Sequence, residues 1–134
     1  MRLISSDDAK TIDIGNSDIW ISIYSTALEA FGTERNKIEK ALEFMKTGRV
    51  ESADGYVVAR QINLIRDKFA GISPDDAVYD FQDRTKVAPW KGKISPVITS
   101  CANLYTTSDG KDLLYEVVGI LVYAQIAGVD VTVE

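Results

Sequence analysis

The chain has 134 residues, of which 46% are hydrophobic and 26% charged, and this composition excludes an intrinsically disordered or membrane-embedded protein. Its length suits a single hydrophobic core, so we expect residues 1–134 to form one domain. The formal net charge of −5 disfavours non-specific binding to nucleic acid or anionic lipid, because phosphates repel an acidic surface, and it favours a basic partner.

Two short strands and a helix are predicted at the start of the chain. The segments from Arg2 to Ile4 and from Lys10 to Ile14 are rich in isoleucine and threonine, which suits a hairpin or an edge strand. The next residues allow two interpretations, because their isoleucines alternate as in a strand but also fit one helical face. We prefer a helix from about Asp18 to Phe31, since it contains good helix formers and Gly32 can end it.

Apolar periodicity predicts two further helices. Thr33 is expected to cap the first, which ends at Gly48. Ser52 or Asp54 can cap the second, whose apolar residues recur at helical spacing until Gly71 ends it.

The clearest local signal is the segment from Ser73 to Asp76, which has a capping serine, a proline at the first helical position and two carboxylates near the positive end of the helix dipole. It predicts a short helix that ends near Asp83. The residues from Arg84 to Pro96 contain two prolines and four cations and predict an irregular, exposed loop. Strand-like residues follow from Val97 to Thr106, although Pro96 could instead start a turn of helix.

The C-terminal part predicts a helix followed by a strand. A turn or cap from Ser108 to Gly110 precedes a helix from about Lys111 to Ala127, which is apolar on most sides and is expected at the centre of the core. Gly128 ends this helix, and the residues from Val129 to Val133 alternate like a strand. We therefore predict an α+β fold, in which a small β-sheet packs against several helices and a buried C-terminal helix is followed by a final strand.

Three features favour a cytoplasmic protein that does not enter a membrane. The first residues are charged where an export signal needs an apolar run. Cys101 is the only cysteine, so no internal disulfide can form. The most apolar stretch, from Leu113 to Val129, contains Glu116 and Gln125 and is shorter than the roughly 20 residues that span a bilayer.

Little in the chain suits catalysis. The absence of histidine removes Ser-His, Cys-His and zinc-His sites and most general-base mechanisms at neutral pH. Cys101 lacks a second cysteine for a metal site, and we interpret it as a small buried hydrophobe. A pair of carboxylates could still serve a hydrolase, but Asp75 and Asp76 already have a structural use at a helix start. We therefore expect no enzyme, no metal and no cofactor.

Two neighbouring features suggest where a protein partner could bind. Asp76, Asp80 and Asp83 fall at i, i+4 and i+7, so the predicted helix would align them on one face. That face is either simply solvated or an acidic patch that mimics phosphate and attracts a basic protein. Trp90 lies among four cations, which suits a loop anchored by a buried indole, a protein-binding hot spot or, last, a nucleobase-stacking site. The predicted partner-binding residues are Asp75, Asp76, Tyr79, Asp80, Asp83 and Trp90.

The C-terminal third resembles a known group of proteins. The runs from Trp90 to Ile94 and from Leu104 to Leu114, the long helix and the residues from Gly128 to Val131 resemble small immunity proteins of bacterial polymorphic-toxin systems, including contact-dependent growth inhibition. The shared positions are turns and core residues, so no functional residue is carried over. The resemblance implies a cytoplasmic antidote that binds one cognate toxin domain, often a nuclease, and blocks its active site or its substrate surface.

An immunity protein is therefore the function that we expect. Two other classes stay open at this point. An accessory subunit or adaptor of a bacterial assembly would show an exposed apolar patch. A histidine-free carboxylate hydrolase would need two acids that converge in a concave pocket.

Overall fold

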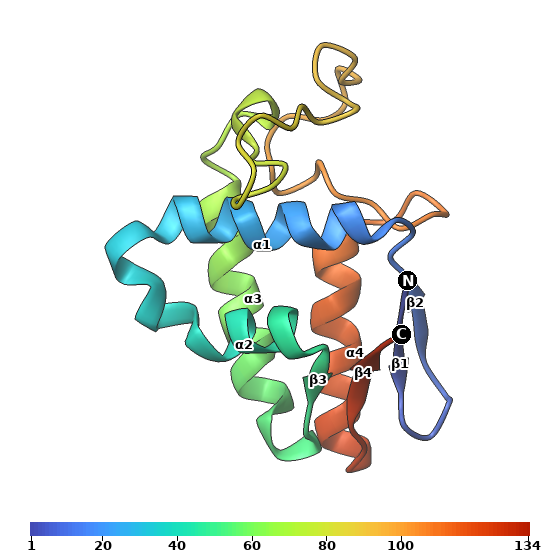
Figure 1. The fold of residues 1–134 in the computed structure, drawn as a ribbon. Helices are drawn as coiled ribbons and strands as arrows, with labels where there is room; N and C mark the ends of the chain where they lie inside the picture. The colour runs from blue at the N-terminus through green and yellow to red at the C-terminus, as the bar shows by residue number, and fades with distance from the viewer.

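Four α-helices and a four-stranded antiparallel sheet form the fold in the computed structural model, which describes residues 1–134 (Figure 1). The fold is α+β, as predicted, and its last helix is followed by a final strand. In chain order, the strands are β1 (Arg2–Ser5), β2 (Thr11–Asp13), β3 (Arg49–Val50) and β4 (Val131–Val133). The α-helices are α1 (Ser17–Phe31), α2 (Glu39–Thr47), α3 (Gly55–Phe69) and α4 (Leu113–Ala127). Three 3-10 helices also occur: η1 (Gly32–Ile38), η2 (Ser52–Asp54) and η3 (Pro74–Asp76).

The sheet joins the two ends of the sequence. Its order is β2-β1-β4-β3, and every neighbouring pair is antiparallel. Strand β4 therefore lies between β1 and β3, and two backbone hydrogen bonds of 2.9 and 2.8 Å connect Arg2 with Glu134. The strands predicted at both ends of the chain are confirmed, whereas β3 was missed because two residues are too few to form a pattern.

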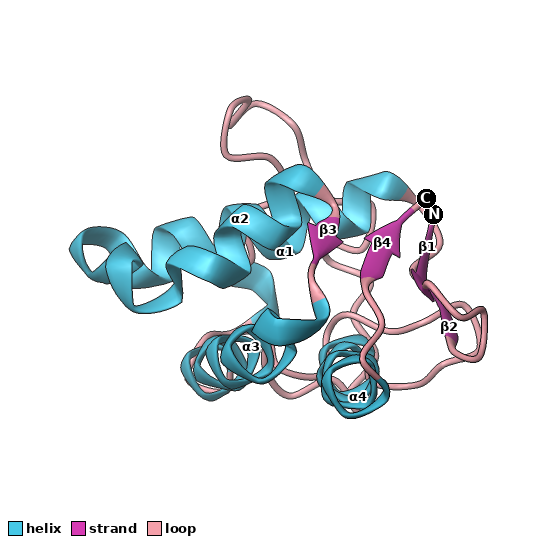
Figure 2. Ribbon diagram, turned by 90° about the horizontal axis from the view of Figure 1, so that it is seen from below, coloured by secondary structure: helices cyan, strands magenta, loops and turns pink.

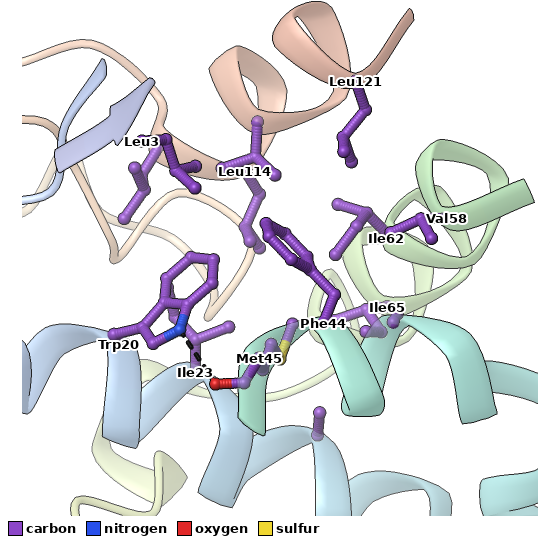
Figure 3. Packing of buried hydrophobic residues seen from close by; sticks show 14 of the residues in the cluster. Leu3, Trp20, Ile23, Phe44, Met45, Val58, Ile62, Ile65, Leu114 and Leu121 are labelled. Atoms are coloured by element: carbon purple, nitrogen blue, oxygen red, sulfur yellow. Dashed lines mark hydrogen bonds between the residues drawn. The ribbon is translucent and has the colours of Figure 1, made fainter. Parts of the chain in front are cut away.

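The helices enclose the core against one side of this sheet. Figure 2 looks along α3 and α4 and shows them side by side, with α4 next to the strands. Figure 3 shows Trp20 of α1 meeting Phe44 edge to face, with ring centroids 5.5 Å apart. The Trp20 indole donates a hydrogen bond of 3.2 Å to the carbonyl of Met45, so the polar edge of this buried ring has a partner. None of the helices combines the length and the apolar composition that crossing a bilayer requires.

The predicted helices α1, α3 and α4 are confirmed. The helical interpretation of α1 is correct: Asn16 caps it by accepting a hydrogen bond from the Asp18 amide, and Gly32 ends it with a φ of 51°. Helix α4 is buried on the side that faces α3 and the sheet, but it is not enclosed on all sides. Tyr115 and Ile126 lie on its solvent face and are 62% and 72% exposed.

The predicted start of α2 is wrong. Thr33 makes no capping hydrogen bond, and a 3-10 helix with a kink at Glu34 precedes the α-helix, which begins only at Glu39. The Arg35 guanidinium donates to the carbonyl of Leu28 at 3.0 Å. This bond holds the connection against the end of α1, and the α-helix begins later in the chain than predicted.

Two other predictions fail between α3 and α4. The helix that starts at Pro74 is a single 3-10 turn, and Ala77 is already extended, with φ −61° and ψ 138°. The residues from Val97 to Thr106 form turns rather than a strand or a helix, and only Thr106 makes an isolated bridge, to Asp112. We call residues 77–112 the long loop.

Candidate functional site

The long loop is the unusual feature of this fold. Connections without secondary structure that exceed about 12–15 residues are uncommon in compact domains, and those that are ordered usually carry function. In Figure 1 the loop gathers at one end of the molecule, next to α1. It has turn hydrogen bonds but no ladder between strands or along a helix, so side-chain contacts contribute much of its order.

Three hydroxyl groups of α1 hold the first part of the loop. Ser22 and Thr26 donate hydrogen bonds to the carbonyl of Val78, at 2.8 and 3.2 Å. The amide of Val78 donates to Thr26 at 3.0 Å, and the amide of Phe81 donates to Ser25 at 2.8 Å. These bonds explain why the predicted helix stops after Asp76: α1 binds backbone groups that a continuing helix would pair internally.

Tyr105 ties a distant part of the loop to the same point. Its hydroxyl lies 2.9 Å from Ser22 Oγ and 3.1 Å from Thr26 Oγ1, and its ring is buried against Phe69. Burial raises the pKa of Tyr105 to about 12, although the bonds to Ser22 and Thr26 act in the opposite direction. The phenol is therefore neutral, and it serves as a hydrogen-bonding group rather than as a charge.

On the outer side of this network the loop forms a hollow of about 240 Å³. Pro74, Arg84, residues 86–88 and Lys91 contribute part of its wall. Five of the six predicted partner-binding residues also line it: Asp75, Asp76, Tyr79, Asp80 and Trp90. We call this feature the Trp90 hollow. Asp83 is the one predicted residue that does not line it.

The aromatic wall of the hollow is fixed by its contacts. The Tyr79 ring meets Trp90 edge to face at 5.5 Å, and Trp90 meets Tyr105 in the same way at 6.2 Å. The Tyr79 hydroxyl donates to the carboxylate of Asp18 at 2.7 Å, and this bond raises the pKa of Tyr79 to about 12. Trp90 is half-buried and packs against the core, so the prediction of an anchored loop is confirmed.

The carboxylates have different partners. Backbone hydrogen bonding to Gln82 and the ammonium of Lys86, 3.2 Å away, lower the pKa of Asp80. Asp83 accepts a hydrogen bond of 3.1 Å from the amide of Thr85. The predicted helical face of Asp76, Asp80 and Asp83 is wrong, because no helix extends past Asp76 to align them. Asp76 and its neighbour Asp75 are exposed and form no ion pair.

Comparison with known proteins identifies the family. The profile of the family described as Immunity protein 70 matches residues 5–133. The chain belongs to this family. No curated protein and no solved structure was found to match it. Membership in Immunity protein 70 confirms the resemblance to immunity proteins, favours that class over an adaptor, and implies a protein as the partner.

The Immunity protein 70 match spans α1 and the whole long loop, so the hydroxyl network and the Trp90 hollow both lie inside the family region. Sequence reasoning missed the network. Its signal was present, since Ser22, Ser25 and Thr26 follow an i, i+3, i+4 spacing on an otherwise apolar helix. Buried hydroxyl groups need hydrogen-bond partners, so a row of them on one helix face indicates that another segment of the chain packs against that face and supplies the partners.

Proposed function

We propose that this immunity protein binds a basic toxin domain, such as a nuclease, through the Trp90 hollow, and blocks its active site or its substrate surface in the cytoplasm. The observation that carries the proposal is an ordered long loop that presents a concave surface with a half-buried tryptophan at its wall. Binding residues occur preferentially on loops that a rigid scaffold positions.

The aromatic side chains support a protein-binding role. Binding energy in protein interfaces concentrates in a few residues, with tryptophan and tyrosine enriched among them. Trp90 and Tyr79 are held in place by each other, by Tyr105 and by Asp18, so they lose little conformational freedom on binding. A partner side chain could thus fill the hollow at a small entropic cost.

The charges support a basic partner. Asp75 and Asp76 have no ion-pair partner in this chain and face solvent beside the hollow, and the chain as a whole carries a formal net charge of −5. Opposite charge accelerates association, and nuclease domains carry cationic surfaces that contact phosphates. Three cations also line the hollow: Arg84 and Lys86 pair with Glu29 and Asp80, whereas Lys91 has no ion-pair partner.

A non-catalytic mode of action is part of this proposal. The chain has no histidine, and burial raises the pKa of the Cys101 thiol to about 11, with a smaller contribution from Asp76. Neutralisation by surface complementarity needs no reacting group in the immunity protein.

The test is co-expression with the toxin domain encoded by the adjacent gene. We expect wild-type chain to restore growth, to bind the purified domain, and to associate more slowly as salt concentration rises. Replacing Asp75 and Asp76 together by asparagine should slow association several-fold at low salt, and Trp90→Ala should accelerate dissociation.

The matched control is Glu43→Gln with Glu51→Gln, which removes the same charge from exposed residues of α2 and the region after β3. If the control and the Asp75/Asp76 variant slow association equally, the hollow is not the contact surface. If the wild-type chain neither binds nor protects, the proposed function itself is wrong.

A further inference from the structure

A buried set of hydroxyl groups connects α1 to the long loop, and we call it the hydroxyl clamp. It consists of the side chains of Ser22, Ser25, Thr26 and Tyr105 and the backbone groups of Val78 and Phe81 that they bind. We infer that the hydroxyl clamp holds the long loop in its toxin-binding conformation, so that its four side chains are positioning residues that the toxin does not touch. This inference rests on the proposed function of the Trp90 hollow.

Outside the clamp, the first half of the loop is attached mainly by the Tyr79–Asp18 hydrogen bond and by the packing of Trp90 against the core. No residue from Asp75 to Ser100 is fully buried, so hydrophobic burial contributes less here than in the helices. The ion pairs that involve Arg84 and Lys86 lie largely in solvent, where such pairs contribute little. By contrast, the four clamp side chains are at most 1% exposed.

The clamp and the docked loop depend on each other. Serine and threonine hydroxyls on a buried helix face are destabilising unless they find partners. In this chain those partners are backbone groups of the loop, since Ser25 binds the amide of Phe81, and Ser22 and Thr26 bind Val78. Lifting the loop would replace these hydrogen bonds by bonds to water, and each bond made inside the protein is worth about 1 kcal/mol more, or about fivefold in the docking equilibrium, so the set favours the docked state.

The clamped positions are those that shape the hollow. Val78 and Phe81 flank Tyr79 and Asp80, two of its lining residues. The fourth clamp residue, Tyr105, packs against Trp90, which with Tyr79 forms the aromatic wall of the hollow. A weaker clamp should therefore let Tyr79, Asp80 and Trp90 leave their positions around the hollow together.

This arrangement predicts a kinetic signature. When only part of the free protein is competent to bind, the apparent affinity falls in proportion to the competent fraction. A clamp variant should therefore associate more slowly with the toxin, while its dissociation rate stays unchanged because no contact with the toxin is lost. An uncharged residue that touches the toxin would instead change mainly the dissociation rate.

The experiment compares Thr26→Val with Thr26→Ser in the full chain. Valine keeps the shape and removes the hydroxyl, whereas serine keeps the hydroxyl. In the free protein, hydrogen exchange of the Phe81 amide, which is bound by Ser25 and not by Thr26, should accelerate about tenfold or more in Thr26→Val and stay near wild type in Thr26→Ser. The indole proton of Trp90 should shift in the NMR spectrum, and that of Trp20, which lies in the helical core, should not.

The double variant Ser25→Ala/Thr26→Val extends the test to binding. We expect its association with the toxin domain to slow by about tenfold or more at an unchanged dissociation rate. Unaltered exchange of the α3 amides would show that the core is folded. If the double variant fails to fold, the single variant Thr26→Val still tests the inference through hydrogen exchange.

Two results would overturn the inference. The first is exchange of the Phe81 amide that stays at the wild-type rate in Thr26→Val, and the second is a released loop that binds the toxin domain as fast as wild type. These outcomes are distinct from failure of the proposed function. If the wild-type chain does not bind the toxin domain, the function and the binding role of the clamp fall together, whereas the exchange experiment still shows whether the clamp holds the loop.

Discussion

The packing of α3 against α4 can be tested with one substitution made at two glycines. Gly55 opens α3, and a Cβ added there would lie 2.5 Å from the carbonyl oxygen of Leu121 and 3.0 Å from Cβ of Gln125. The first of these atoms belongs to the backbone of α4, so it cannot move aside by a rotamer change. Gly119 lies in the middle of α4, is exposed, and has no atom within 4 Å of such a Cβ.

The two sites should therefore respond with opposite sign. In a helix interior alanine is more stable than glycine by about 0.5–1 kcal/mol, and Gly119→Ala should gain that amount. At Gly55 the gain is smaller, because the residue is in the first turn, and overpacking costs about 1–3 kcal/mol. We expect Gly55→Ala to lose about 1–2 kcal/mol, or about 3–8 °C in melting temperature for a domain of this size.

Urea and thermal unfolding followed by circular dichroism would measure both variants against wild type. The difference between the two substitutions is the quantity of interest, because it removes that part of alanine's preference for helices that both sites share. If Gly55→Ala proved as stabilising as Gly119→Ala, the close approach of α3 to α4 would be refuted.

Three further predictions concern single contacts. Asn16→Ala should cost about 1 kcal/mol of unfolding free energy, because it removes the cap of α1, and an unchanged urea midpoint would contradict this. The pKa of the Cys101 thiol is raised in the fold from 9.0 to about 11, so the unfolded chain loses this proton first. The contribution of this thiol to the unfolding free energy should therefore be constant below pH 9 and be lost between pH 9 and 11, so that the free energy falls less in Cys101→Ala than in wild type over this range; equal slopes in urea titrations would exclude the effect. Arg84→Ala should change the unfolding free energy by less than about 0.5 kcal/mol, because its ion pair with Glu29 is exposed, and a larger loss would mean that Arg84 stabilises the loop.

The elements that sequence reasoning located correctly are those whose signals are local. Helix α1 has a capping residue at Asn16 and a glycine at its end, and α4 has an N-cap at Asp112 and ends at Gly128. The spacing of their apolar residues agrees with these boundaries, so the capping residues and the residues that pack in the core predict the same helices. The strands β1, β2 and β4 alternate in the way that one buried face requires.

The failures occur where a distant residue determines the local structure. Ser73 and Pro74 do start a helical turn, as their types predict, but Ser25 and Thr26 bind the backbone a few residues later. Those partners lie about fifty positions earlier in the chain, with sequence separations of 56 and 52. No local pattern contains that information.

Five of the six predicted partner-binding residues come together in the structure, but not through the predicted helix. Asp76, Asp80 and Asp83 were grouped by helical spacing, yet it is the turn and the extended backbone after Asp76 that bring Asp76 and Asp80 to one hollow and leave Asp83 outside it. Trp90 reaches the same hollow through its contact with Tyr79. Such convergence depends on how the long loop folds back on α1, which composition and periodicity do not specify.

The position of β4 in the sheet affects how the protein forms during synthesis. The β1–β2 hairpin is made first, yet β3 pairs with no strand other than β4, which is translated near the end. The hairpin and β3 therefore stay separate until residues 131–133 leave the ribosome. Strands that are far apart in the sequence also pair slowly. A premature stop codon just before Val131 would remove a central strand and separate the hairpin from β3.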